Sequence, residues 1–155
     1  MSEYFLVKTL HIVSSTILFG TGIGSAFYML LASLQRDVRV VHFVARRVVL
    51  ADWLFTTPAI VVQPLTGVYL AHLAGFPLTS TWLVVSIVLY FLAGACWLPV
   101  VWIQMRMRNL AAQAAAQDTA LPEAYRRYFL AWFALGVPAF LALVAVFYLM
   151  VAKPV

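Results

Sequence analysis

The chain has 155 residues, of which 65% are hydrophobic and only 10% are charged. Soluble globular domains are typically about 45–50% apolar and about 25% charged. This composition excludes an ordinary water-soluble domain, a disordered chain and a nucleic-acid-binding module, even though the formal net charge is +5. The sequence instead predicts a small all-α protein that crosses the membrane several times.

Four apolar stretches are long enough to cross about 30 Å of hydrocarbon, which takes about 20 helical residues. Each must be helical, because lipid offers no hydrogen-bond partner to free backbone groups. With no internal repeat and no separate soluble segment, residues 1–155 are expected to form one four-helix transmembrane domain. The spans are predicted at residues 4–34, 43–73, 81–104 and 128–152.

The basic residues predict the orientation of these helices. Eight arginines lie in or beside the connections at 34–42 and 105–127, whereas Lys8 and Lys153 lie on the opposite side. Positively charged connections usually stay in the cytoplasm. Both termini are therefore expected on the outer, periplasmic side of a bacterial inner membrane. The Ala- and Gln-rich run at 111–117 favours a separate short surface helix.

One face of the first predicted helix carries most of its polar groups. Polar side chains within hydrocarbon usually face the bundle interior. Imidazole is a common ligand of haem iron, and the thin glycine-rich part of this helix could lie against a flat macrocycle. A buried histidine bonded to a serine, with close helix packing at the glycines, explains the same pattern equally well. The residues at steps of three and four are Lys8, His11, Ser15, Leu18, Gly22 and Ser25.

The second predicted helix has a polar face of its own, formed by Asp52, Thr56, Gln63 and Thr66. Asp52 lies near the cytoplasmic end of this helix, within reach of the arginine pair at 46–47. Two interpretations stay open for it: a structural ion pair, or a group that takes up protons or contacts a substrate.

Two prolines, Pro58 and Pro64, interrupt the second helix, and the resulting kinks could widen a pocket. His72 lies at the outer end of this helix, off the polar face and shallower than His11. It is therefore a poor candidate for a second haem ligand, and the alternative is a solvated histidine at the membrane interface. Tyr90 lies on an aromatic face of the third helix, a pattern that more often reflects packing than a cofactor site.

Short motifs in chain order resemble the HemJ/CopD-like group of small bacterial membrane proteins. These are 8–12 (KTLHI), 54–59 (LFTTPA) continuing to Gly67, 81–83 (TWL), and Tyr90. Within that group, the chain most resembles a family of predicted integral membrane proteins. The resemblance covers most of the chain, from residue 4 into the fourth helix.

The resemblance implies a four-helix core around a b-type haem. The histidine of the Lys-x-x-His pattern is an axial ligand there and corresponds to His11, with Lys8 placed to meet a haem propionate. HemJ is a protoporphyrinogen oxidase with a functionally important lysine in its third helix, and Ser86 occupies that position here. The oxidase activity is therefore an alternative rather than the main expectation.

The function expected from the sequence is electron transfer or redox sensing by a membrane-bound b-type haem, with quinone or a periplasmic protein as redox partner. Alternatives are a protoporphyrinogen oxidase-like enzyme, a copper-handling protein, and a cofactor-free subunit of a membrane complex. A homodimer could form through the small-residue faces. The iron ligands would be His11 and, less readily, His72; the residues around the haem would be Lys8, His11, Ser15, Gly22, Gln63 and Tyr90.

Overall fold

The computed structural model describes residues 2–35 and 37–154. Four rods in this part of the chain are long and apolar enough to cross a membrane, and all regular structure is helical. The predicted all-α fold with four spans is thus confirmed. The helices are α1 (Ser2–Gln35), α2 (Val38–Ala51), the π-helical turn η1 (Asp52–Thr56), α3 (Thr57–Leu73), α4 (Thr81–Ala116) and α5 (Glu123–Ala152).

Three helix boundaries differ from the prediction by five residues or more, and one of them is the start of α5, at Glu123 instead of residue 128. α4 runs without a break to Ala116, so the prediction of a separate surface helix at 111–117 is wrong. The residues after Gln104 are mostly Met, Arg, Leu, Ala and Gln, which are strong helix formers, and none of them ends the helix. The second span begins earlier than predicted because the carboxylate of Asp37 caps α2 and accepts hydrogen bonds from the backbone N–H groups of Arg39 and Val40.

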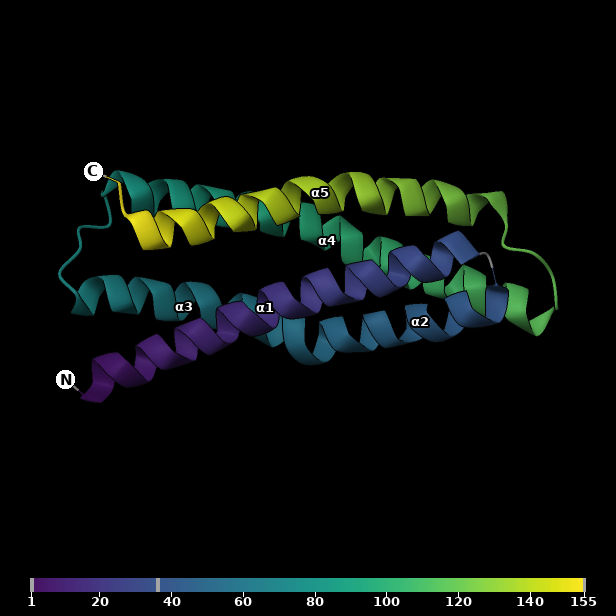
Figure 1. The fold of residues 1–155 in the computed structure, drawn as a ribbon, viewed down its shortest axis with the longest axis horizontal. Helices are drawn as coiled ribbons and strands as arrows, with labels where there is room; N and C mark the ends of the chain where they lie inside the picture. Colours follow the sequence, from purple (N-terminus) through teal and green to yellow (C-terminus); the bar gives the residue numbers. More distant parts are fainter. Residues whose placement is uncertain (1, 36, 155) are drawn as a thin grey trace.

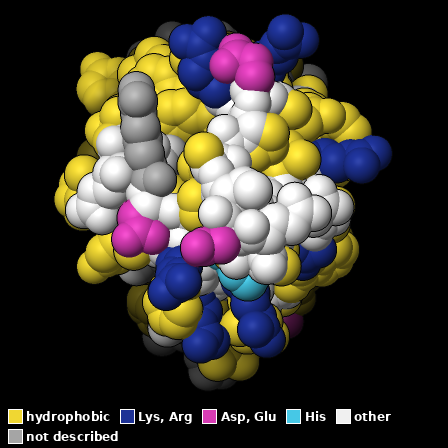
Figure 2. All heavy atoms as spheres, turned by 90° about the vertical axis from the view of Figure 1, so that its right-hand side faces the viewer, with side chains coloured by type: hydrophobic (Ala, Val, Ile, Leu, Met, Phe, Trp, Pro, Cys, Tyr) yellow, Lys and Arg dark blue, Asp and Glu magenta, His cyan; other side chains and the backbone are white. Residues whose placement is uncertain are grey.

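The rods are longer than a bilayer is thick. α4 has 36 residues, which corresponds to about 54 Å at 1.5 Å per residue. One end of the bundle carries the two termini, and the other carries the connections from α1 to α2 and from α4 to α5 (Figure 1), near which the described arginines lie in the sequence. Figure 2 views this arginine-rich end, where basic side chains gather at the top, at the right and along the bottom of the view. Which side of the membrane it faces stays a prediction.

The helices pack as two layers over the half of the bundle that carries the termini. α1 lies along α3 in one layer, and α4 lies along α5 in the other (Figure 1). At the arginine-rich end α2 packs against both α1 and α4, and the main buried core joins the layers there through residues such as Met29, Val41 and Met107. A smaller cluster around Ala71 and Trp82 joins them near the termini.

The π-helical turn η1 has a direct cause in the sequence. Pro58 has no N–H group, and its ring would collide with the carbonyl four residues earlier in a regular α-helix. The chain widens into a π turn just before this proline, so that the N–H and the hydroxyl of Thr57 both donate to the carbonyl of Asp52. The side chains of Asp52 and Thr56 are thereby buried inside the bundle.

Candidate functional site

A cavity of about 460 Å³ lies midway along the bundle, between the two helix layers. This volume falls within the range of about 300–1,000 Å³ that is typical of small-molecule sites. α1, η1, the start of α3, α4 and α5 all contribute to its walls, which are almost entirely apolar. We call it the central cavity.

Three glycines help to create this space. Gly22 on α1, Gly94 on α4 and Gly136 on α5 all line the central cavity. A Cβ atom built at any of them would meet no other atom within 4 Å. The cavity is therefore open at these positions, and larger side chains there would fill it.

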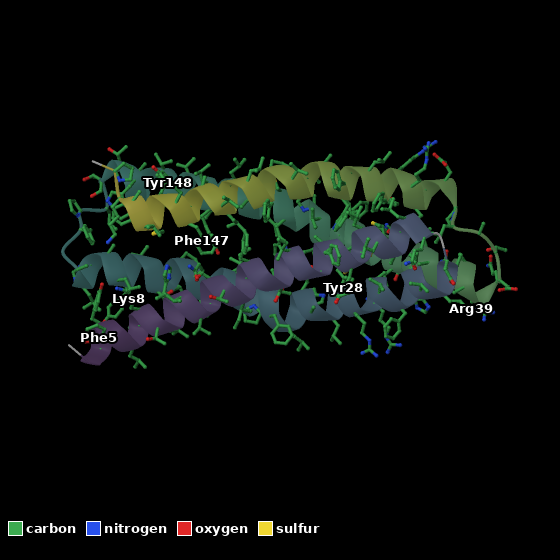
Figure 3. The ribbon with its side chains drawn as sticks, in the orientation of Figure 1. Phe5, Lys8, Tyr28, Arg39, Phe147 and Tyr148 are labelled. Atoms are coloured by element: carbon green, nitrogen blue, oxygen red, sulfur yellow. The ribbon has the colours of Figure 1, made fainter. Side chains whose placement is uncertain are left out.

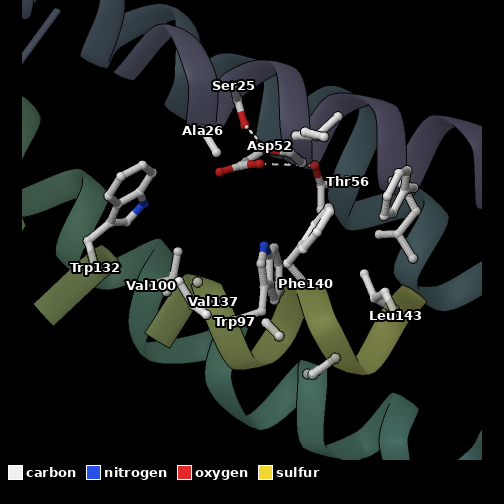
Figure 4. Close-up of a pocket in the computed structure, with 18 of the residues that line it drawn as sticks. Ser25, Ala26, Asp52, Thr56, Trp97, Val100, Trp132, Val137, Phe140 and Leu143 are labelled. Carbon is white, nitrogen blue, oxygen red and sulfur yellow. Dashed lines mark hydrogen bonds between the residues drawn. The ribbon is translucent and has the colours of Figure 1, made fainter. Parts of the chain in front are cut away.

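A small polar group lies in the otherwise apolar wall. The hydroxyl of Thr56 donates a 2.9 Å hydrogen bond to Oδ1 of Asp52, and both side chains are buried (Figure 4). Gln104 of α4 lies beside Asp52 and lines the same cavity. Asp52 and Gln104 are each only 5% exposed, yet Oδ2 of Asp52 and Oε1 of Gln104 have no hydrogen-bond partner among the described residues.

The ion-pair interpretation of Asp52 is not supported. Within residues 2–35 and 37–154 the ion pairs are Arg39 with Asp118 and Arg126 with Glu123, and all four side chains are exposed. The arginine pair at 46–47 is also exposed. Because η1 turns Asp52 into the bundle, its carboxylate faces the central cavity instead.

His11 lies in a second polar cluster, between α1 and α3. Its Nδ1 lies 2.8 Å from the hydroxyl of Thr66, and its Nε2 lies 3.1 Å from the amide nitrogen of Gln63. The Thr66 hydroxyl also donates to the carbonyl of Val62, so its oxygen accepts from Nδ1–H of His11. Nε2 then accepts from the Gln63 amide, and both ring nitrogens have protein partners.

The imidazole of His11 is also closely packed against the backbone of α3. A Cβ atom on Gly67 would lie 3.1 Å from its Cε1 atom, so the ring fits there only because residue 67 lacks a side chain. His11 does not line the central cavity. The polar face predicted on the second helix is therefore divided between two sites. Asp52 and Thr56 line the central cavity, whereas Gln63 and Thr66 contact His11.

These residues do not fit a haem in their present arrangement. Iron would need a free nitrogen lone pair on His11, and Gln63 occupies the one on Nε2. Among the described residues that line the central cavity there is no His, Cys, Met or Lys. Haem binding itself stays a prediction.

The other residues predicted around a haem are scattered. Gly22 and Tyr90 line the central cavity, and the Tyr90 hydroxyl donates to the carbonyl of Ile60. Lys8 is exposed on the half of α1 that carries the N-terminus (Figure 3), with its ammonium 5.5 Å from the centre of the Tyr4 ring.

The hydroxyl of Ser15 bonds to its own helix, at the carbonyl of Ile12. His72 is exposed, six residues beyond Thr66, which places it about 9 Å further along α3 and on another face from the residue that contacts His11. The structure thus brings Gln63, but not His72, to His11.

The sequence matches one family over residues 5–154. The chain belongs to the family described as "Predicted integral membrane protein (DUF2269)". No curated protein and no solved structure matches it. This membership supports the membrane-integrated character predicted from composition, whereas the wider relation to the HemJ/CopD-like group stays a prediction.

Gln104 is a candidate site residue that was not predicted from the sequence, because it lies at the predicted end of the third span. Its spacing from other residues could have indicated it. Tyr90, Trp97 and Gln104 follow one another at steps of seven, which places them on one face of a helix, and all three line the central cavity.

Proposed function

We propose that this protein binds a lipid-soluble molecule in the central cavity, within the membrane. The observation that carries the proposal is the pair of buried, unpartnered oxygens, on Asp52 and Gln104, in an apolar cavity of ligand size. A buried polar atom without a partner destabilises the fold. A ligand that donates hydrogen bonds to these two oxygens would therefore stabilise the protein.

The surrounding helices support entry from the bilayer. Ile23 of α1 and Leu141 of α5 both line the central cavity, and they are 47% and 59% exposed. The cavity is therefore open beside these two helices, and a ligand would enter it from the bilayer between α1 and α5. Beside this opening, Phe19 of α1 stacks on Phe140 and meets Phe147 edge-on, both with ring centres 5.3 Å apart.

A neutral apolar fluorophore, N-phenyl-1-naphthylamine, tests the proposal in lipid nanodiscs. We expect saturable binding to the wild type that is lost in Gly94→Leu, since a leucine would fill the cavity at a position where space is open. Gly20→Leu is the matched control, because Gly20 also has open space around it but does not line the cavity. Equal binding by both variants, or no saturable binding by the wild type, would contradict the proposal.

The quinol expected as redox partner is one member of this broad class of ligands, since it is lipid-soluble and donates hydrogen bonds. Electron transfer through a b-type haem stays a separate proposal. It requires Gln63 to release Nε2 of His11 and the helices to make room for a macrocycle beside α1. A bacterial inner-membrane location stays a prediction as well.

A further inference from the structure

We infer that the molecule held in the central cavity is a hydrophobic organic cation, with the carboxylate of Asp52 as its counter-charge. This inference rests on the proposed function, because it specifies the charge of the ligand in the same cavity. Three features of the cavity support a cation: its charge, the geometry of its polar side chains and the nature of its walls.

The described residues of the cavity wall include an acidic side chain but no basic one. Asp52 is the only acidic residue among the described residues that line it, and none of them is basic. A carboxylate within a membrane protein is normally paired with a cation or with several hydrogen-bond donors, because removal from water is costly. The hydroxyl of Thr56 donates to Oδ1 and the side chain of Gln104 lies beside the carboxylate, but Oδ2 has no hydrogen-bond partner among the described residues. A positively charged ligand would complete the pairing, whereas an anionic lipid headgroup would be repelled.

The polar side chains in the cavity wall are placed to accept hydrogen bonds from a ligand. Oδ1 of Asp52 is occupied by Thr56, but Oδ2 is free, and Oε1 of Gln104 offers a second acceptor on the neighbouring helix. The other hydroxyls that line the cavity, on Ser25 and Tyr90, already donate to backbone carbonyls. An ammonium group could donate to both free oxygens, and these charge-assisted bonds are among the stronger ones in proteins.

The walls suit the apolar part of such a cation. Trp97, Trp132 and Phe140 face the same space as the carboxyl group of Asp52 (Figure 4). Aromatic faces attract cations through their quadrupoles, and tryptophan does so most strongly. An aromatic chamber with one carboxylate therefore favours a bulky cation over a neutral or anionic molecule of the same size.

Tetraphenylphosphonium and tetraphenylborate provide a matched test, because they share size and shape but carry opposite charges. Binding is measured by equilibrium dialysis with full-length protein in nanodiscs of zwitterionic lipid. We expect the wild type to bind the phosphonium saturably and the borate only at the level of empty nanodiscs. Asp52→Asn removes the charge attraction and should weaken phosphonium binding by about tenfold to a hundredfold. Asp118→Asn removes the same charge from an exposed site and should leave binding unchanged.

N-phenyl-1-naphthylamine separates the two claims. If Asp52→Asn still binds this neutral probe, the cavity is intact and the loss of phosphonium binding reports on charge. If Asp52→Asn does not fold, Asp52→Glu tests the charge instead: it keeps the carboxylate and should retain phosphonium binding, and its failure to bind phosphonium while still binding the neutral probe would overturn the inference. If the wild type binds the neutral probe but binds the phosphonium no better than the borate, the inference of a cationic ligand is wrong, while the proposal of a ligand-binding cavity still holds. Failure of every probe to bind would overturn the proposed function itself.

Discussion

The hydroxyl of Tyr90 on α4 donates a 2.6 Å hydrogen bond to the carbonyl of Ile60 on α3. Pro64 lies four residues after Ile60 within α3 and has no N–H group with which to complete the helical bond. Tyr90 supplies the missing donor from the opposite layer of the bundle. Tyr90 was predicted to lie at a cofactor site. In the structure its hydroxyl instead bonds to the backbone of α3, at the edge of the central cavity.

Removing the hydroxyl of Tyr90 should destabilise the protein only when residue 64 is proline. We expect Tyr90→Phe to lower the free energy of unfolding by about 1 kcal/mol, as for other hydrogen bonds between membrane helices. In a Pro64→Ala background the alanine N–H can bond to Ile60, so the same substitution should cost close to nothing. Reversible unfolding of the four variants in mixed micelles measures this coupling, and an equal cost in both backgrounds would contradict the explanation.

A side chain at position 67 should disturb His11. We expect Gly67→Val to displace the imidazole from Thr66 and Gln63 and to cost about 1–3 kcal/mol, the usual range for overpacking. Gly20→Val is the control, since its side chain would enter open space. Thermal unfolding checks this. If Gly67→Val unfolds at the wild-type temperature, the close packing of His11 against α3 is wrong.

The absorption spectrum of the purified protein tests the haem hypothesis. If His11 keeps both of its ring nitrogens bonded within the protein, as in the structure, expression with ample haem should give no Soret band that depends on His11. Oxidised and dithionite-reduced spectra of the wild type, His11→Ala and His72→Ala provide the comparison. A b-type spectrum that disappears in His11→Ala would show that Gln63 gives way to iron.

Asp52 is expected to serve binding rather than stability. Replacing buried charged groups by apolar ones is often neutral or stabilising. We therefore expect Asp52→Leu to unfold at the same temperature as the wild type or higher in the absence of ligand, while losing phosphonium binding. Ser86→Leu is a suitable comparison, because Ser86 is also buried but lies outside the cavity and bonds within its own helix; it should destabilise by overpacking. A large loss of stability in Asp52→Leu would assign the carboxylate a structural role.

The sequence predicted the four spans well because length and apolar composition alone decide whether a helix can cross lipid. Spacing also identified the polar face that holds Asp52 and Gln63. It did not reveal that this face divides between two places, since the division depends on how α3 pairs with α1 and on the π turn before Pro58. The partners of His11 come from another helix, and such pairing has no signature within a single span.

Photolabelling of the carboxylates tests the central cavity most directly. An alkyl diazirine such as adamantyl diazirine is neutral and membrane-soluble, and on illumination it forms esters with nearby carboxylates that peptide mass spectrometry can locate. We predict an adduct on Asp52 in membranes containing the wild type or Gly20→Leu, and its loss in Gly94→Leu, where the cavity is filled. An unlabelled Asp52 in the wild type, or equal labelling of Asp52 in Gly94→Leu, would contradict a ligand site at this position.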